Sequence, residues 1–88
     1  MNASVRYEIK IKSSAEKEMN ALPLRVFTNI SNVMLTLEST PRPHGCKKLR
    51  GREEYRMRVG NYRILYSVND KARIVEIVAV GDRKEVYR

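Results

Sequence analysis

The chain has 88 residues, enough for one domain with a small hydrophobic core, and it carries a net charge of +8. Thirteen of its 18 lysines and arginines lie from Arg42 onward, against six of its ten acidic residues, so the second half should attract nucleic acid or an acidic protein. The single Cys46 excludes an internal disulfide, and Glu76 interrupts the most apolar run, residues 74–80, which excludes a transmembrane helix. We expect a soluble, cytoplasmic protein with one domain over residues 1–88.

The N-terminal half predicts a strand followed by two helices. Apolar and charged residues alternate from 5 to 11, which is typical of a strand with one buried face. Ser13 and Glu16 fit a capping box at the start of the first helix. Pro23 either ends this helix or opens the next one at its first position. Apolar residues at spacings of one, three and four over 26–37 then predict an amphipathic helix.

The rest of the chain predicts three or four strands. Prolines within residues 39–43 end the second helix. Four later segments have the composition of strands, the first of them short: residues 47–49, 55–59, 62–66 and 74–80. The Gly60–Asn61 break between the second and third of these segments predicts a β-hairpin. The sequence therefore indicates an α+β fold in which both helices cover one face of a sheet.

The predicted hairpin places three arginines on the other face. With Gly60–Asn61 as its loop, Arg58 pairs with Arg63 and Arg56 pairs with Leu65. Because side chains alternate across the pleat, the three arginines project together and the apolar residues between them project toward the helices. Like charges directly opposite each other destabilise a sheet. This register favours a face that binds a polyanion, and the alternative is an ordinary solvated surface.

Three segments resemble the RelE/ParE superfamily of toxins from type II toxin–antitoxin systems, and its RelE-like branch in particular. They are Lys48–Gly51, Tyr55–Tyr66 and Val80–Tyr87. The resemblance covers essentially the whole chain. It implies a RelE-like fold of order β-α-α-β-β-β(-β), with an antiparallel sheet packed on two N-terminal helices. It also implies a ribosome-dependent endoribonuclease that cuts mRNA and inhibits translation, a cognate antitoxin that neutralises it, and contact with operator DNA only through the antitoxin complex, with no membrane partner.

The resemblance also implies roles for individual residues. The candidate catalytic residues are Arg56, Arg58, Arg63, Arg83 and Tyr87. In the implied reaction the RNA 2′-OH attacks the adjacent phosphorus, and fixed guanidinium groups stabilise the charge that gathers on the phosphate. Arg63 and Arg83 would clamp this phosphate, and Tyr87 would stack on a base or align the 2′-OH. The candidate contacts to RNA or the ribosome are Lys47, Lys48, Arg50 and Arg52.

No cofactor or metal is implied, because the chain has one histidine, one cysteine and no carboxylate cluster. RelE carries lysines at the positions of Arg56 and Arg58, and arginine cannot usefully act as a general base. Catalysis would then rest on charge stabilisation and on geometry imposed by the ribosome. Two alternatives remain open. One is a ParE-like inhibitor of DNA gyrase, and the other is a catalytically weak relative that acts as an antitoxin-binding or DNA-corepressor module.

Overall fold

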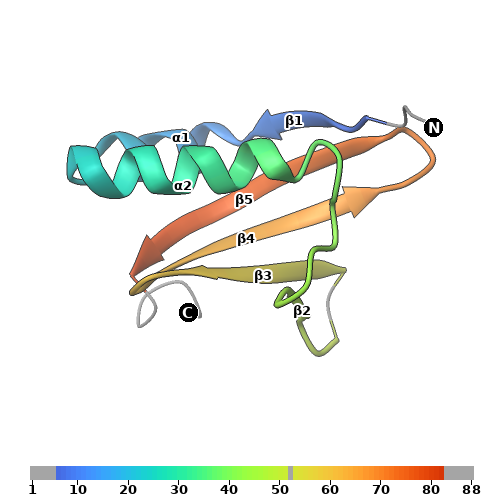
Figure 1. Cartoon of the computed structure of the whole chain (residues 1–88). Coiled ribbons are helices and arrows are strands. Elements are labelled where there is room, and N and C mark those ends of the chain that lie inside the picture. The colour runs from blue at the N-terminus through green and yellow to red at the C-terminus, as the bar shows by residue number, and fades with distance from the viewer. Residues whose placement is uncertain (1–5, 52, 83–88) are drawn as a thin grey trace.

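Two helices pack on one face of a five-stranded sheet in the computed structural model, which describes residues 6–51 and 53–82 (Figure 1). The elements are β1 (Glu8–Ile11), α1 (Ser13–Asn20), α2 (Leu24–Thr36), β2 (Lys47–Lys48), β3 (Glu54–Val59), β4 (Tyr62–Asn69) and β5 (Ile74–Asp82). Their order along the chain is the predicted one, including the short edge strand. The strands lie in the order β1-β5-β4-β3-β2. The predicted α+β fold is therefore confirmed.

The sheet is mixed, because one of its four strand pairs is parallel. Strands β2 to β5 form an antiparallel meander, as the short connections between them require. Strand β1 instead pairs in parallel with β5, with Ile9 beside Val75. A parallel neighbour needs a long connection, and here the connection contains both helices and the rest of the sheet. The expectation of a purely antiparallel sheet therefore holds for β2–β5 and not for β1.

Both helices bury one apolar stripe against the sheet. Ala15 and Met19 of α1 and Ile30 and Met34 of α2 are at most 4% exposed. They share one core with apolar residues of β4 and β5, and the helices run side by side in opposite directions over that face (Figure 1). No helix in the described ranges is both long and apolar enough to cross a bilayer.

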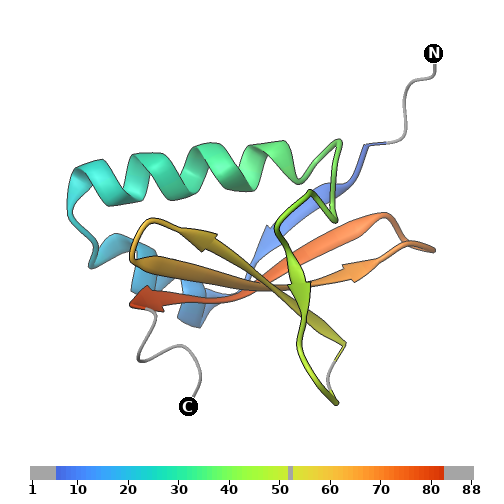
Figure 2. The same ribbon diagram turned by 60° about the horizontal axis from the view of Figure 1, so that its bottom comes forward.

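The helix starts differ in detail from the prediction. Ser13 is the first residue of α1 and Lys12 occupies the N-cap, where no side chain caps the helix, so the predicted capping box is wrong. Pro23 occupies the N-cap of α2, which fits its fixed φ and its missing N–H. The segment that follows α2 runs from the helix layer across the sheet to the β2 edge (Figure 1, Figure 2).

The hairpin register is the predicted one. Arg58 lies opposite Arg63 and Arg56 lies opposite Leu65. Gly60 has φ +61°, whereas Asn61 does not have a positive φ. This is the pattern of a type II′ turn, whose twist matches that of the flanking strands. A two-residue loop of this type fixes the register between the two strands, which is why the sequence could predict that register.

A β-bulge in β5 changes which side chains face the helices: odd-numbered residues such as Val75 and Ile77 do so before the bulge, and the even-numbered Val80 does so after it. Leu65 pairs with Ala79 and Tyr66 pairs with Ile77, so Val78 is the extra residue. Val80 consequently joins the core, and Gly81 falls opposite Arg63 on the other face. The backbone N–H of Val80 donates a 2.9 Å hydrogen bond to Glu18 Oε1, which fixes α1 to this end of β5.

Candidate functional site

The face of the sheet away from the helices carries the three hairpin arginines. Arg56 and Arg58 alternate along β3, and Arg63 lies opposite Arg58 on β4. Arg58 is exposed and Arg56 is half-buried. Arg63 is only 5% exposed, and it is the one buried charged side chain among residues 6–51 and 53–82. The predicted grouping of these arginines on one face is therefore confirmed, with unequal access to solvent.

The neighbours of Arg63 explain how such a large side chain is accommodated. Gly81 lies directly opposite Arg63 on β5 and has no side chain to compete for the space above the strands. Leu65, which is 2% exposed, lies on the same face two residues from Arg63 and opposite Arg56. Long arginine side chains commonly cover apolar surface with their aliphatic stems. The register places the stems of Arg56 and Arg63 to cover Leu65. The Nε of Arg63 is itself buried, so this guanidinium group does not extend into solvent.

A cationic recess opens beside these arginines at the β2 edge. It has a volume of about 240 Å³, and among residues 6–51 and 53–82 it is lined by Gly45, Lys47, Arg56 and Arg58, whose three side chains all carry a positive charge. Lys47 pairs with Arg56 across β2 and β3. Gly45 has φ +98°, a conformation that side chains rarely adopt, and a glycine here leaves its backbone exposed to the recess. A phosphate or a carboxylate is the ligand that such a lining attracts.

The other predicted binding residues are not all in the recess. Lys48 projects from the opposite side of β2, and its Nζ lies 3.9 Å from Glu53 Oε2. Arg50 is exposed in the turn between β2 and β3. These two side chains border the site rather than line it. Three further candidates, Arg52, Arg83 and Tyr87, lie outside the residues that the structure describes.

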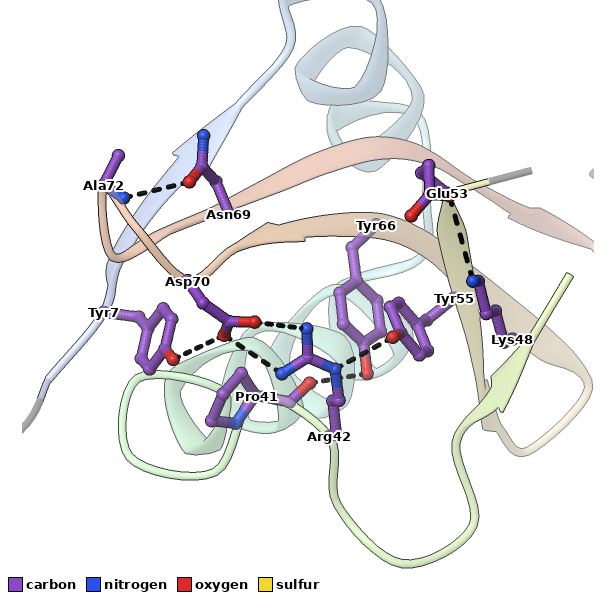
Figure 3. A network of polar contacts seen from close by, with 10 residues as sticks. All are labelled: Tyr7, Pro41, Arg42, Lys48, Glu53, Tyr55, Tyr66, Asn69, Asp70 and Ala72. Atoms are coloured by element: carbon purple, nitrogen blue, oxygen red, sulfur yellow. Dashed lines mark hydrogen bonds and ion pairs between the residues drawn. The ribbon is translucent and has the colours of Figure 1, made fainter.

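A polar network at the other end of β4 was not predicted from the sequence (Figure 3). The carboxylate of Asp70 accepts two hydrogen bonds from Arg42, at 3.1 and 2.9 Å, and one from the hydroxyl of Tyr7, at 2.7 Å. The Arg42 guanidinium, and next the Tyr7 hydroxyl, hold the pKa of Asp70 below its usual value. The hydrogen bond that the Tyr7 hydroxyl donates to Asp70 in turn raises the pKa of Tyr7. No local pattern links these residues, since Arg42 and Asp70 are 28 positions apart.

The helix layer has a concavity of its own. A groove of about 440 Å³ lies between β1, α1 and α2 and is mainly apolar. Ile11 and Leu35 line it and are 41% and 59% exposed, which is unusual for large apolar side chains. Glu16 and Glu38 also line it, so this groove lacks the uniform positive charge of the recess. Within the described ranges, no three or more His, Cys, Asp and Glu side chains are grouped so that they could hold a metal ion.

The arrangement of a two-helix layer, a meander sheet and a basic hairpin has known counterparts. Residues 9–87 match the family of ParE toxins of the type II toxin–antitoxin system parDE. The chain belongs to this family. Among curated proteins, this toxin is 27% identical over 88 residues to RelE1, a toxin homologue of Methanocaldococcus jannaschii, covering 96% of this chain and 98% of that protein.

Solved structures of RelE toxins share the toxin's fold. The RelE–RelB complex of the archaeon Pyrococcus horikoshii OT3 has a TM-score of 0.81 and 30% identity, over 91% of this chain and 98% of that chain. A mutant of the Escherichia coli toxin RelE in the free state has a TM-score of 0.79 and 28% identity, over 93% of this chain and 90% of that chain. The resemblance of the toxin's sequence to the RelE/ParE superfamily is thus confirmed.

Proposed function

We propose that this toxin is a ribosome-dependent endoribonuclease that inhibits translation in the cytoplasm by cutting mRNA. The observation that carries the proposal is the arginine face, in which the buried Arg63 opposes Arg58 beside a recess that the described part of the chain lines with Gly45 and three cationic side chains. A fold gains nothing in stability from two arginines directly opposite each other. Their placement is useful if a phosphate lies between them, because a charge that develops there is met by guanidinium groups already in position.

The proposed reaction uses the RNA itself as the nucleophile. The 2′-oxygen forms a bond to the adjacent phosphorus, and the bond from phosphorus to the 5′-oxygen of the next nucleotide breaks. The products are a 2′,3′-cyclic phosphate and a 5′-hydroxyl end, so the proton lost by the 2′-OH is matched by the proton gained by the 5′-oxygen. Arg58 and Arg63 would bind the non-bridging oxygens as their charge increases. Arg83 is the proposed donor of the proton to the 5′-oxygen, solvent water would take the proton of the 2′-OH and return one to Arg83, and Tyr87 would align the 2′-OH.

Arginine is a poor acceptor for the proton of the 2′-OH, because its guanidinium group already carries its proton at neutral pH and holds it tightly. Arg56 and Arg58 therefore serve the reaction through charge, and Arg56 with Lys47 would hold the phosphate backbone in the recess. Lys48, Arg50 and Arg52 would add contacts to the RNA or the ribosome. Together with Tyr87, the ribosome would align the 2′-OH for attack on the phosphorus. Such alignment can contribute a large part of a rate enhancement.

A cognate antitoxin is the proposed protein partner. Relatives of this chain have been solved as complexes with RelB antitoxins. The apolar groove that contains Ile11 and Leu35 is suited to the apolar side of an amphipathic segment that folds on binding. An acidic part of the same partner would cover the arginine face and compete with RNA. Operator DNA would be reached only through this complex. If antitoxin titrated onto toxin-bound ribosomes formed a ternary complex that still cut mRNA, this account of inhibition would fail.

The matched family itself favours a second candidate function. Its members are described as ParE toxins, and the sequence left open a ParE-like inhibitor of DNA gyrase. Such an inhibitor needs a surface that binds gyrase, and it does not need to cleave a phosphodiester bond. The two functions make different demands on Arg58 and Arg63, which only the nuclease needs as transition-state contacts.

Primer extension on cellular mRNA after brief expression separates the two functions. The nuclease predicts new 5′ ends that are phased with codons, appear within translated regions and disappear in an Arg63→Met variant. The gyrase inhibitor predicts no such ends and a loss of negative supercoiling in a reporter plasmid. Growth arrest with unchanged mRNA ends would reject the nuclease proposal.

A further inference from the structure

One wall of the cationic recess belongs to a segment that is held by contacts outside the recess. The wall is formed by Gly45 and Lys47, which belong to the segment that follows α2. This segment must leave the helix layer, cross the sheet and present Gly45 and Lys47 beside Arg56 and Arg58 (Figure 1, Figure 2). Its path is fixed by contacts at Pro41 and Arg42, a few residues before the wall.

Arg42 joins three parts of the fold through one guanidinium group. Nη1 and Nη2 donate to the two carboxylate oxygens of Asp70, at 3.1 and 2.9 Å, in the turn between β4 and β5. Nε donates to the hydroxyl of Tyr55 on β3 at 2.9 Å. Figure 3 shows the guanidinium between these two partners, with Tyr7 reaching Asp70 from the other side. A bidentate pair of this kind fixes orientation as well as distance.

The sheet side of this contact is rigid. Tyr66 is fully buried, its hydroxyl donates a 2.9 Å hydrogen bond to the backbone oxygen of Pro41, and burial raises its pKa. Tyr55 stacks on Tyr66 with ring centroids 5.8 Å apart. The guanidinium of Arg42 also lies 5.2 Å from the centre of the Tyr55 ring. The two tyrosines therefore present a fixed surface, and Arg42 bound to Asp70 holds the segment against it.

The distance along the chain from this anchor to the recess is short. Arg42 is three residues before Gly45, and the backbone N–H of Cys46 donates a 3.0 Å hydrogen bond to the oxygen of Pro43, which closes a tight turn between them. Lys47 then enters β2 opposite Arg56. A shift of Arg42 would consequently move Gly45 and Lys47 with it.

We propose that Asp70 is a positioning residue for a polyanion: through Arg42 it holds the Gly45–Lys47 wall where an RNA phosphate can bind. The proposal rests on the proposed function in taking RNA as the ligand. The effect that we expect from removing Asp70 is opposite to the effect that net charge alone predicts. Removing an acidic residue from a protein of net charge +8 should strengthen the binding of a polyanion, whereas removing Asp70 should weaken it.

The test measures binding of a short single-stranded oligonucleotide with 2′-deoxyriboses, which a reaction through the 2′-OH cannot cut. Asp70→Ala is compared with Glu53→Ala, which removes the same charge from the exposed partner of Lys48 and leaves the Arg42 contacts intact. We expect Asp70→Ala to bind roughly threefold more weakly than the parent, since the wall occupies its binding position less of the time. Glu53→Ala should bind as tightly as the parent or more tightly. Asp70→Asn, which keeps a hydrogen-bond acceptor at this position, should lie between the parent and Asp70→Ala.

A double-mutant cycle with Lys47 identifies the route of the effect. If Asp70 acts by placing this wall, Asp70→Ala should cost much less affinity in a Lys47→Ala background than in the parent. A purely structural role would leave the two effects additive, whatever Asp70→Ala does to the melting temperature. Tighter binding by Asp70→Ala, additive effects, or a parent protein that does not bind the oligonucleotide would overturn the inference. A parent that binds it and cuts no mRNA on ribosomes would reject the proposed function and leave the inference standing.

Discussion

Replacing Arg58 with glutamine should make the protein more stable and less active. Arg58 lies directly opposite Arg63. Arg63 is only 5% exposed, so water screens the charge of Arg63 poorly. Like charges at such a position destabilise an antiparallel pair by about 0.2–1 kcal/mol. In a domain of this size, 1 kcal/mol moves the melting temperature by roughly 4–8 °C, so the variant should melt about 1–8 °C higher.

The matched control for this variant is Arg58→Lys, which keeps the charge and should melt close to the parent. Because salt screens charge, the difference between the two variants should shrink as ionic strength rises. Cleavage of ribosome-bound mRNA by Arg58→Gln should fall about 100-fold or more, the usual cost of losing one transition-state donor. Equal melting temperatures for the glutamine and lysine variants at low salt would refute the argument from charge repulsion. Parental cleavage by a more stable Arg58→Gln would refute the role of Arg58.

Three other predictions follow from single contacts. Arg63→Met keeps the volume of a buried side chain, so it should remain folded by circular dichroism and yet cut mRNA about 100–1000-fold more slowly. Glu18→Ala removes the acceptor of the Val80 N–H and should lower the free energy of unfolding by about 1 kcal/mol in urea titrations, whereas Glu16→Ala should change it little. Hydrogen bonds lower the pKa of Asp70, so its stabilising contribution is present above the ordinary carboxyl pKa of ~3.9 and is lost as the pH falls through the lower value of the folded state. The melting temperature of the parent should then fall more steeply below about pH 4 than that of Asp70→Asn, and parallel curves would contradict this.

The part of the site that the sequence predicts is the part that a short loop fixes. The Gly60–Asn61 turn determines the pairing of β3 with β4, and that pairing places Arg56, Arg58 and Arg63 on one face. The helices could be predicted for a similar reason, since each is set by the spacing of neighbouring residues. The face that the arginines occupy thus follows from local rules alone.

What the sequence could not predict depends on contacts between distant residues. Alternation along 74–80 gives no sign of the bulge at Val78, yet this bulge brings Gly81 opposite Arg63. The parallel pairing of β1 with β5 has no local signal either. Asp70 looks like an ordinary turn residue until the fold brings it to Arg42. Such pairs become visible only when the whole sheet is assembled.

The measurement that tests the central claim most directly is the chemistry of RNA ends made by the purified toxin on programmed ribosomes. The proposed mechanism predicts cleavage of the bound mRNA to a 2′,3′-cyclic phosphate and a 5′-hydroxyl, and little product from Arg63→Met. An mRNA with 2′-deoxyribose at the cleavage position should remain intact, because it lacks the nucleophile. Products with 5′-phosphate ends, cleavage of the deoxy-substituted mRNA, or full activity in Arg63→Met would contradict the account.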